Sequence, residues 1–91
     1  MPTSASETDI LSVIARYLEQ NLNPPPDDPI TAETRLLDDL ALDSLQTFEM
    51  IALLEDHFRL TLSIDVMSDA QTVGDVARAV ARVLAREAAQ G

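Results

Sequence analysis

The sequence predicts an all-α fold, a small four-helix bundle in which three longer helices and one short third helix pack together. Three segments repeat apolar residues at helical spacing, and the one short segment that alternates has no second strand to pair with. The core has to be aliphatic, because 46% of the residues are hydrophobic but only 3% are aromatic. The chain is expected to form one domain over residues 1–91.

The first helix is predicted within residues 4–22, where Ser4 and Glu7 have the spacing of a capping box. Its apolar face consists of Ile10, Leu11, Ile14, Tyr17 and Leu18. The prolines of "NPPP" end this helix, since proline has no amide hydrogen to donate. A long loop follows, between the first and second helices, and loops of this length are usually functional. Four residues should hold it to the core: Ile30, Leu36, Leu37 and Leu40.

The second helix is predicted over residues 44–58. Asp43 is its expected N-cap, and Gln46 completes a capping box. The apolar face should comprise Phe48, Ile51, Ala52, Leu54 and Phe58. Three further apolar residues lie outside the centre of that face and should leave apolar surface near the acidic groups: Leu45, Met50 and Leu53.

The remaining elements are a short helix near Asp65–Ser68 and a last helix that begins at Thr72. Asp75 has the spacing to form a capping box with Thr72. The apolar stripe of the last helix contains Val73, Val76, Ala77, Val80, Val83 and Leu84. One polar face carries arginines spaced by four residues, at Arg78, Arg82 and Arg86. The final "EAAQG" is expected to fray.

The net charge of −10 is concentrated in the middle of the chain. Residues 27–75 hold twelve acidic side chains and two arginines, whereas residues 76–91 hold three arginines and one glutamate. Such a field repels nucleic acid and anionic lipid and attracts basic partners, although acidity also simply keeps a small protein soluble. No apolar run approaches the roughly 18 residues of a membrane span, and the N-terminus lacks the basic start of a secretory signal, so a cytoplasmic location is expected.

Three roles are open for Ser44, which stands at the start of the second helix among acidic residues. As an ordinary first-turn residue it would need no role beyond the neighbouring cap. A catalytic serine needs a base, but the only histidine, His57, is about three and a half turns away on the same helix. As an attachment point, Ser44 would place a phosphate near free amides and the positive end of the helix dipole.

Of these three roles, only that of an attachment point explains the position of Ser44, its acidic surroundings and the long preceding loop at the same time. The absence of cysteine excludes disulfides, thiolate metal sites and cysteine nucleophiles. The spacing of an EF-hand is also absent, so no specific metal site is expected.

Two segments of the chain resemble a known family. The segment "TRLLDDLALDSLQTFEMIALLEDHF" resembles the core of an acyl carrier protein, with its Asp-Ser-Leu triplet at the start of an acidic helix. The segment "LTLSIDVMSDAQTVGDVARAV" is similar to the third helix of that family and to the Thr-Val start of its fourth. The resemblance covers about residues 8–85.

This resemblance implies a carrier and not an enzyme. A phosphopantetheinyl transferase would attach 4'-phosphopantetheine from coenzyme A to Ser44, which Asp43 and Leu45 flank, and acyl groups would be held on the arm as thioesters. Acyl-transferring, ketosynthase-type or acyl-activating enzymes would dock through basic patches. The implied partner-binding residues are Gln46, Glu49, Met50, Leu53, Glu55 and Asp56. The implied lining of the interior, which can shelter an acyl chain, is Leu36, Phe48, Leu54, Leu62, Met67 and Val73.

The chain departs from the family pattern next to Ser44. The usual glycine is Ala41, the usual small residue is Leu42, and an acid is replaced by Gln46. These changes and the "NPPPDDP" loop predict a specialised carrier, and they are expected to select partners and not to stabilise the fold. A free-standing protein is expected, since the chain opens with Met1 and closes soon after its last helix, and it is also expected to be a monomer. The alternatives are a peptidyl or aminoacyl carrier, or an unmodified helical interaction module.

Overall fold

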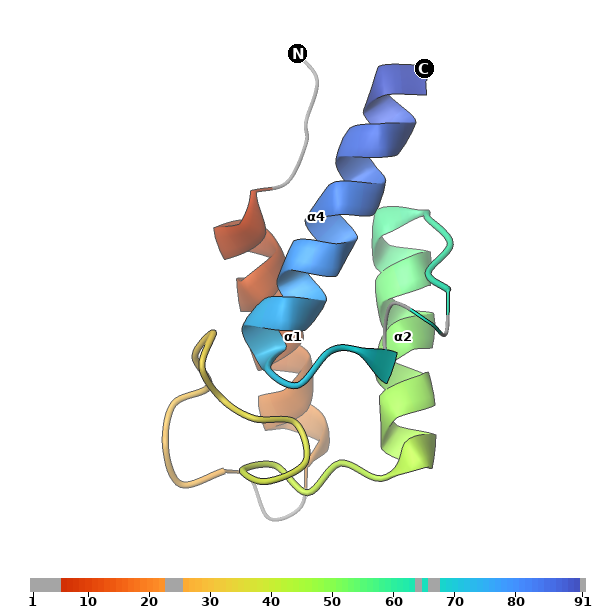
Figure 1. The fold of residues 1–91 in the computed structure, drawn as a ribbon. Helices are drawn as coiled ribbons and strands as arrows, with labels where there is room; N and C mark the ends of the chain where they lie inside the picture. The colour runs from red at the N-terminus through yellow and green to blue at the C-terminus, as the bar shows by residue number, and fades with distance from the viewer. Residues whose placement is uncertain (1–5, 23–25, 64, 66–67, 91) are drawn as a thin grey trace.

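The computed structural model describes residues 6–22, 26–63, 65 and 68–90, without the side chains of 88–90. Three helices are present there: α1 (Glu7–Asn21), α2 (Ser44–Phe58) and α4 (Val73–Gln90) (Figure 1). The described residues form no strand, only an isolated bridge between Arg35 and Thr72. The all-α prediction is therefore confirmed. The expected short third helix near Asp65–Ser68 includes residues 66 and 67, which lie outside the described residues, so the four-helix count stays a prediction.

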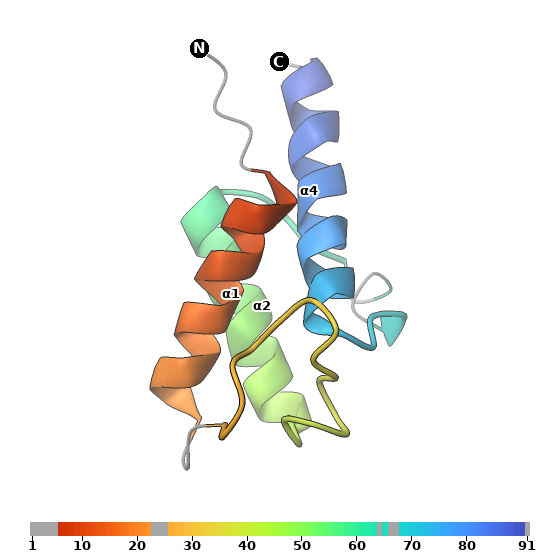
Figure 2. The ribbon, with the colours of Figure 1, turned by 90° about the vertical axis from the view of Figure 1, so that its left-hand side faces the viewer.

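The three helices and both connecting loops share one aliphatic core. α1 packs mainly against α4 and touches α2 less extensively, while the loop after α1 crosses the end of the bundle (Figures 1 and 2). The helices contribute Ile10, Ile14, Leu18, Met50, Ile51, Leu54, Val73, Val76, Ala77 and Val80. The loops contribute Ile30, Leu36, Leu40, Leu42, Leu60 and Leu62. No buried residue in this core is aromatic, as the composition predicts.

α1 begins two residues later than the Ser4–Glu7 box predicts. Its N-cap is Ser6, whose Oγ accepts a hydrogen bond from the Asp9 amide at 3.2 Å, and Asp9 Oδ2 accepts one in return from the Ser6 amide at 3.3 Å. Both pairs have capping-box spacing, so the pattern alone does not choose between them. In the pair that forms, Glu7 lies in the first turn, where the helix dipole favours an acid.

α2 has the predicted bounds, and its predicted capping box is confirmed. Asp43 Oδ1 accepts from the Gln46 amide at 2.7 Å, and Gln46 Oε1 accepts from the Asp43 amide at 3.2 Å. The predicted orientation of the helix is partly wrong. Met50 is fully buried, whereas Ala52 is exposed and Phe48 is 53% exposed. Eight of the fifteen residues of α2 are apolar and point in most directions, so helical spacing does not single out the buried face.

α4 has the predicted capping box and apolar stripe. Thr72 and Asp75 exchange two hydrogen bonds of 3.1 Å, and the Gln71 amide donates to Asp75 at 2.9 Å. The hydrogen bonds from the Gln71 and Thr72 amides hold the pKa of Asp75 below its ordinary value. The helix continues to Gln90 and so includes residues 87–90, which were expected to fray.

The long loop is bonded to the start of α4. The Leu36 amide donates to the Gln71 carbonyl at 2.9 Å, and the amides of Val73 and Gly74 donate to the carbonyls of Thr34 and Ala32, both at 2.9 Å. Amides in the first turn of a helix have no partner within the helix, and here the loop supplies one. None of the helices in the described part of the chain has both the length and the hydropathy that crossing a membrane requires. The cytoplasmic location stays a prediction.

Candidate functional site at the start of α2

Ser44 is the first residue of α2, and its side chain is exposed. Its hydroxyl makes no hydrogen bond to any described residue, because the capping oxygen belongs to Asp43. The Thr47 amide donates to the Asp43 carbonyl at 3.0 Å, and the Gln46 amide is capped, which leaves the first two amides of the helix to solvent. The site therefore presents a free hydroxyl beside free backbone donors.

The structure provides no catalytic partner for Ser44 within the described residues. His57 lies at the other end of α2, about 20 Å along the helix. Its ring packs edge-on against Phe58, with 4.7 Å between the ring centroids. No group of described acidic or histidine side chains is arranged to hold a metal ion. Nucleophilic and metal-dependent roles for this site have no support in the geometry.

A mainly apolar groove of about 320 Å³ opens beside Ser44. Its apolar walls come from Leu36, Leu37, Leu42, Phe48, Ile51 and Ala70. Asp43, Ser44, Thr47 and Ser68 supply its polar edge. The groove therefore offers an apolar surface within reach of anything attached to the Ser44 hydroxyl.

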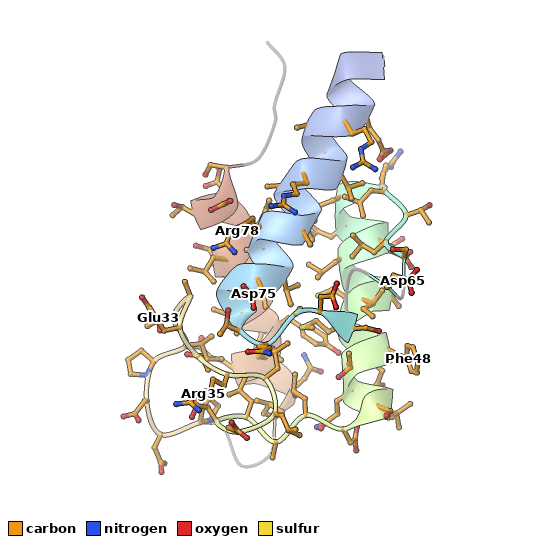
Figure 3. The ribbon with its side chains drawn as sticks, in the orientation of Figure 1. Glu33, Arg35, Phe48, Asp65, Asp75 and Arg78 are labelled. Atoms are coloured by element: carbon orange, nitrogen blue, oxygen red, sulfur yellow. The ribbon has the colours of Figure 1, made fainter. Side chains whose placement is uncertain are left out.

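Exposed apolar side chains surround the mouth of this groove. Leu37 is 71% exposed, Leu45 is 66% exposed and Phe48 is 53% exposed. Figure 3 shows Phe48 pointing away from the bundle near the start of α2. The expectation that Leu37 is anchored in the core is wrong, as is the expectation that Phe48 lies in the interior. We refer to Leu37, Leu45 and Phe48 as the apolar rim.

The predicted partner-binding residues do not form a single surface. Glu49 and Asp56 are exposed, but Met50 is fully buried, so its expected place at the surface is wrong. Gln46 is occupied in the capping box, and Glu55 Oε2 accepts a hydrogen bond from the Leu62 amide at 2.9 Å. Glu55 therefore holds the loop after α2 in place.

Leu53 lies on the side of α2 that faces α1. It lines a separate groove of about 270 Å³ together with Tyr17 and His57. Burial raises the pKa of Tyr17, and the nearby charge of Glu49 raises it further.

The residues expected to line the interior are mostly in place. Leu36, Leu54, Leu62 and Val73 are buried. Met67 lies outside the described residues. Leu42, which was expected to select partners, is only 6% exposed and belongs to the core. It lies two residues before Ser44 and fixes the approach of the loop to α2.

The turn before Ser44 depends on a residue that the sequence pattern does not reveal. Ala41 has φ of 53°, in the left-handed region that favours glycine. This conformation reverses the chain so that the Ala41 amide reaches the Leu37 carbonyl at 2.9 Å and the Leu42 amide reaches the Leu36 carbonyl at 3.0 Å. The only signal in the sequence was the departure from the family, whose usual residue at this position is glycine.

Comparisons with known proteins identify relatives of this chain. The family model described as "Phosphopantetheine attachment site" matches residues 8–80. An acyl carrier protein from Caulobacter vibrioides is 30% identical over 71 residues, which is 78% of this chain and 90% of that relative.

Two solved structures have the same fold as this chain. One, described as an acyl carrier protein from Mycobacterium tuberculosis, has a TM-score of 0.71 and 37% identity over 80% of this chain and 96% of its own. The holo acyl carrier protein from Geobacter metallireducens has a TM-score of 0.71 and 27% identity, over 90% of this chain and 93% of its own. The chain belongs to the acyl carrier protein family, whose members carry covalent 4'-phosphopantetheine and serve partner enzymes as carriers, not as enzymes themselves.

Proposed function

We propose that Ser44 carries the 4'-phosphopantetheine and that the chain presents acyl groups to the enzymes of a biosynthetic pathway. This pathway makes either fatty acids or specialised products such as lipids or polyketides, and we favour the specialised role. The observation that carries this proposal is the exposed Ser44 hydroxyl, free of hydrogen bonds to described residues, beside an apolar groove. The specialised role is supported by the departures at Ala41, Leu42 and Gln46 and by the "NPPPDDP" loop.

The residues around Ser44 fit such an arm. The free amides at the start of α2 and the positive end of the helix dipole favour a phosphate there, and they offset the neighbouring Asp43 carboxylate. Leu42, Phe48 and the other groove residues can cover the apolar part of an attached chain and keep water from it. The thiol of the arm supplies the thioester linkage that this cysteine-free chain cannot form by itself.

Docking of partner enzymes is proposed to combine charge with apolar contact. Glu49 and Asp56 are exposed on α2 and attract basic patches on the transferase and on acyl-transferring, ketosynthase-type or acyl-activating enzymes. The apolar rim then supplies the contact that is buried as the enzyme closes over Ser44. A monomer suffices for this role, because every residue that it uses comes from one chain.

The test is incubation with coenzyme A and a broad-specificity phosphopantetheinyl transferase, followed by intact-mass measurement. We expect the wild-type protein to gain the mass of one phosphopantetheine and Ser44→Ala to gain none. Ser12→Ala, at an exposed serine on α1, is the matched control and should be modified like the wild type. A modified Ser44→Ala protein would place the attachment elsewhere, and an unmodified wild type would favour an unmodified interaction module.

The alternative within the same fold is a peptidyl or aminoacyl carrier. Its main support is the missing acid at Gln46, but Gln46 has a structural role in the capping box of α2. Loading assays with acyl-activating and amino-acid-activating enzymes separate the two possibilities. Preferential loading by the amino-acid-activating enzymes would overturn the acyl assignment while leaving Ser44 as the attachment site.

A further inference from the structure

α4 is longer than the bundle it packs against. Its buried residues are Val73, Val76, Ala77 and Val80, all in the first eight positions of the helix, and no described side chain beyond Val80 is buried. Figures 1 and 2 show from two directions that the C-terminal end of α4 extends past the ends of α1 and α2. We refer to residues 81–90 as the projecting segment.

The projecting segment is basic in an otherwise acidic chain. It carries Arg82, Arg86 and a single acid, Glu87, while the whole chain has a net charge of −10. Both arginines are exposed, and neither forms an ion pair with a described residue. Their spacing of four residues places them on one face of the helix.

Arg78, one turn earlier on the same helix, behaves differently. It forms ion pairs with Asp75 at 3.3 Å and with Glu7 at 4.0 Å, and Figure 3 shows it beside Asp75 where α4 still packs against the bundle. Within the bundle, therefore, the basic face of α4 is neutralised by the chain itself. Arg82 lines a shallow pocket together with Asp69 and Asp75 but forms no ion pair with a described residue, and Arg86 lies one turn further out.

The projecting segment also retains apolar surface. Val83 and Leu84 continue the stripe that is buried as far as Val80, and both are half-buried because they pack only against the edge of the core. Residues 85–87 are exposed, and a helix end without packing gains little stability from its own hydrogen bonds, so contact with another surface would stabilise it.

We propose that the projecting segment is a docking surface for an acidic patch on a protein partner. Arg82 and Arg86 pair with carboxylates of the partner, and Val83, at the edge of the arginine face, supplies an apolar contact. This surface is separate from the acidic surface around Ser44 and is opposite to it in charge. The proposal does not depend on the modification of Ser44.

The distribution of charge over the chain favours a protein as the partner of the projecting segment. A membrane or a nucleic acid presents uniform negative charge and is repelled by the twelve acids of residues 27–75. A second copy of this chain carries the same net charge of −10 and is repelled as well. A protein partner can place an acidic patch against the arginines and a neutral or basic surface against the rest of the molecule.

The test is an NMR titration of the isotope-labelled full chain with a synthetic amphipathic peptide of glutamate and leucine. We expect amide shifts centred on residues 81–87 and, in the Arg82→Glu/Arg86→Glu variant, binding weaker by about tenfold. The matched control is Arg16→Glu/Arg59→Glu, which changes the net charge equally at exposed arginines outside α4 and should bind within about twofold of the wild type. Circular dichroism verifies that both variants are folded.

Four results would overturn the proposal. The first is a lack of binding, or shifts spread over α2. The second is an equal loss in the control variant, which would mean that only net charge matters. The third is tighter binding to phosphatidylglycerol vesicles than to the peptide, which would indicate a membrane. The fourth is concentration-dependent dimerisation that is lost in Arg82→Glu/Arg86→Glu, which would indicate a second copy. Modification of Ser44, measured on the same samples by intact mass, reports separately on the proposed function.

Discussion

At the scale of single residues, Ala41 is the point where sequence and backbone disagree most. An alanine with φ of 53° is strained by its Cβ, whereas glycine adopts this conformation freely. We therefore predict that Ala41→Gly raises the free energy of unfolding by about 1 kcal/mol, measured by urea denaturation. This replaces the sequence-based expectation that the substitution leaves stability almost unchanged.

The same substitution at Ala52 is the control for this prediction. Ala52 is exposed within α2 and has no positive φ, so Ala52→Gly should lower the free energy of unfolding by about 1 kcal/mol. Opposite signs for the two variants would establish that the effect at position 41 comes from the local backbone. A loss of stability at both positions would contradict the strain argument.

Single residues also show what the sequence can predict. The capping box of Asp43 and Gln46 was predictable because it depends on a spacing of three residues and on nothing distant. The orientations of Phe48 and Met50 were not, because α2 has apolar side chains on most of its circumference. Leu37 and Leu42 lie in a loop, where no periodicity distinguishes the exposed leucine from the buried one.

At the scale of elements, the junction between the long loop and α4 depends on Gly74. A Cβ at this position would lie 2.8 Å from the Ala32 carbonyl oxygen and 3.0 Å from the Ala32 Cβ. The contact cannot be relieved by a side-chain rotation, because the oxygen belongs to the backbone. It would also displace the hydrogen bond from the Gly74 amide to that oxygen.

We predict that Gly74→Ala lowers the free energy of unfolding by about 1–3 kcal/mol, the usual cost of overpacking. Helix propensity acts in the opposite direction, since alanine in a helix is favoured over glycine by about 1 kcal/mol. The sign of the change in the free energy of unfolding, measured by urea denaturation, therefore shows whether overpacking or helix propensity is the larger effect. A more stable Gly74→Ala protein would mean that the loop moves away from α4 at little cost.

Sequence patterns located the helices but not this junction. The bounds of α2 and the start of α4 follow from caps and periodicity, which are local. The bonds from residues 71–74 to residues 32–36 join segments that are far apart in the chain. No spacing rule connects these two segments. Ala41 has a backbone conformation that favours glycine, but the sequence has no glycine there to mark the turn.

At the scale of the whole molecule, charge is expected to determine how partners approach Ser44. Glu49 and Asp56 are exposed on α2, within the segment that holds twelve of the sixteen acids. Opposite charges accelerate encounter, and salt screens them beyond about 10 Å at 0.1 M ionic strength. The rate of modification at low protein concentration measures this step, since it reports on productive encounter with the transferase.

We predict that Glu49→Lys/Asp56→Lys lowers the transferase kcat/KM by about tenfold and weakens its dependence on salt. The control is Glu19→Lys/Glu87→Lys, which changes the net charge by the same amount at exposed acids outside residues 27–75. Because the field is strongest near the acids that face the enzyme, the control should retain most of the wild-type rate. Equal losses in both variants would show that net charge alone steers the encounter. Unchanged rates in the α2 variant would leave the apolar rim of Leu37, Leu45 and Phe48 as the dominant contact.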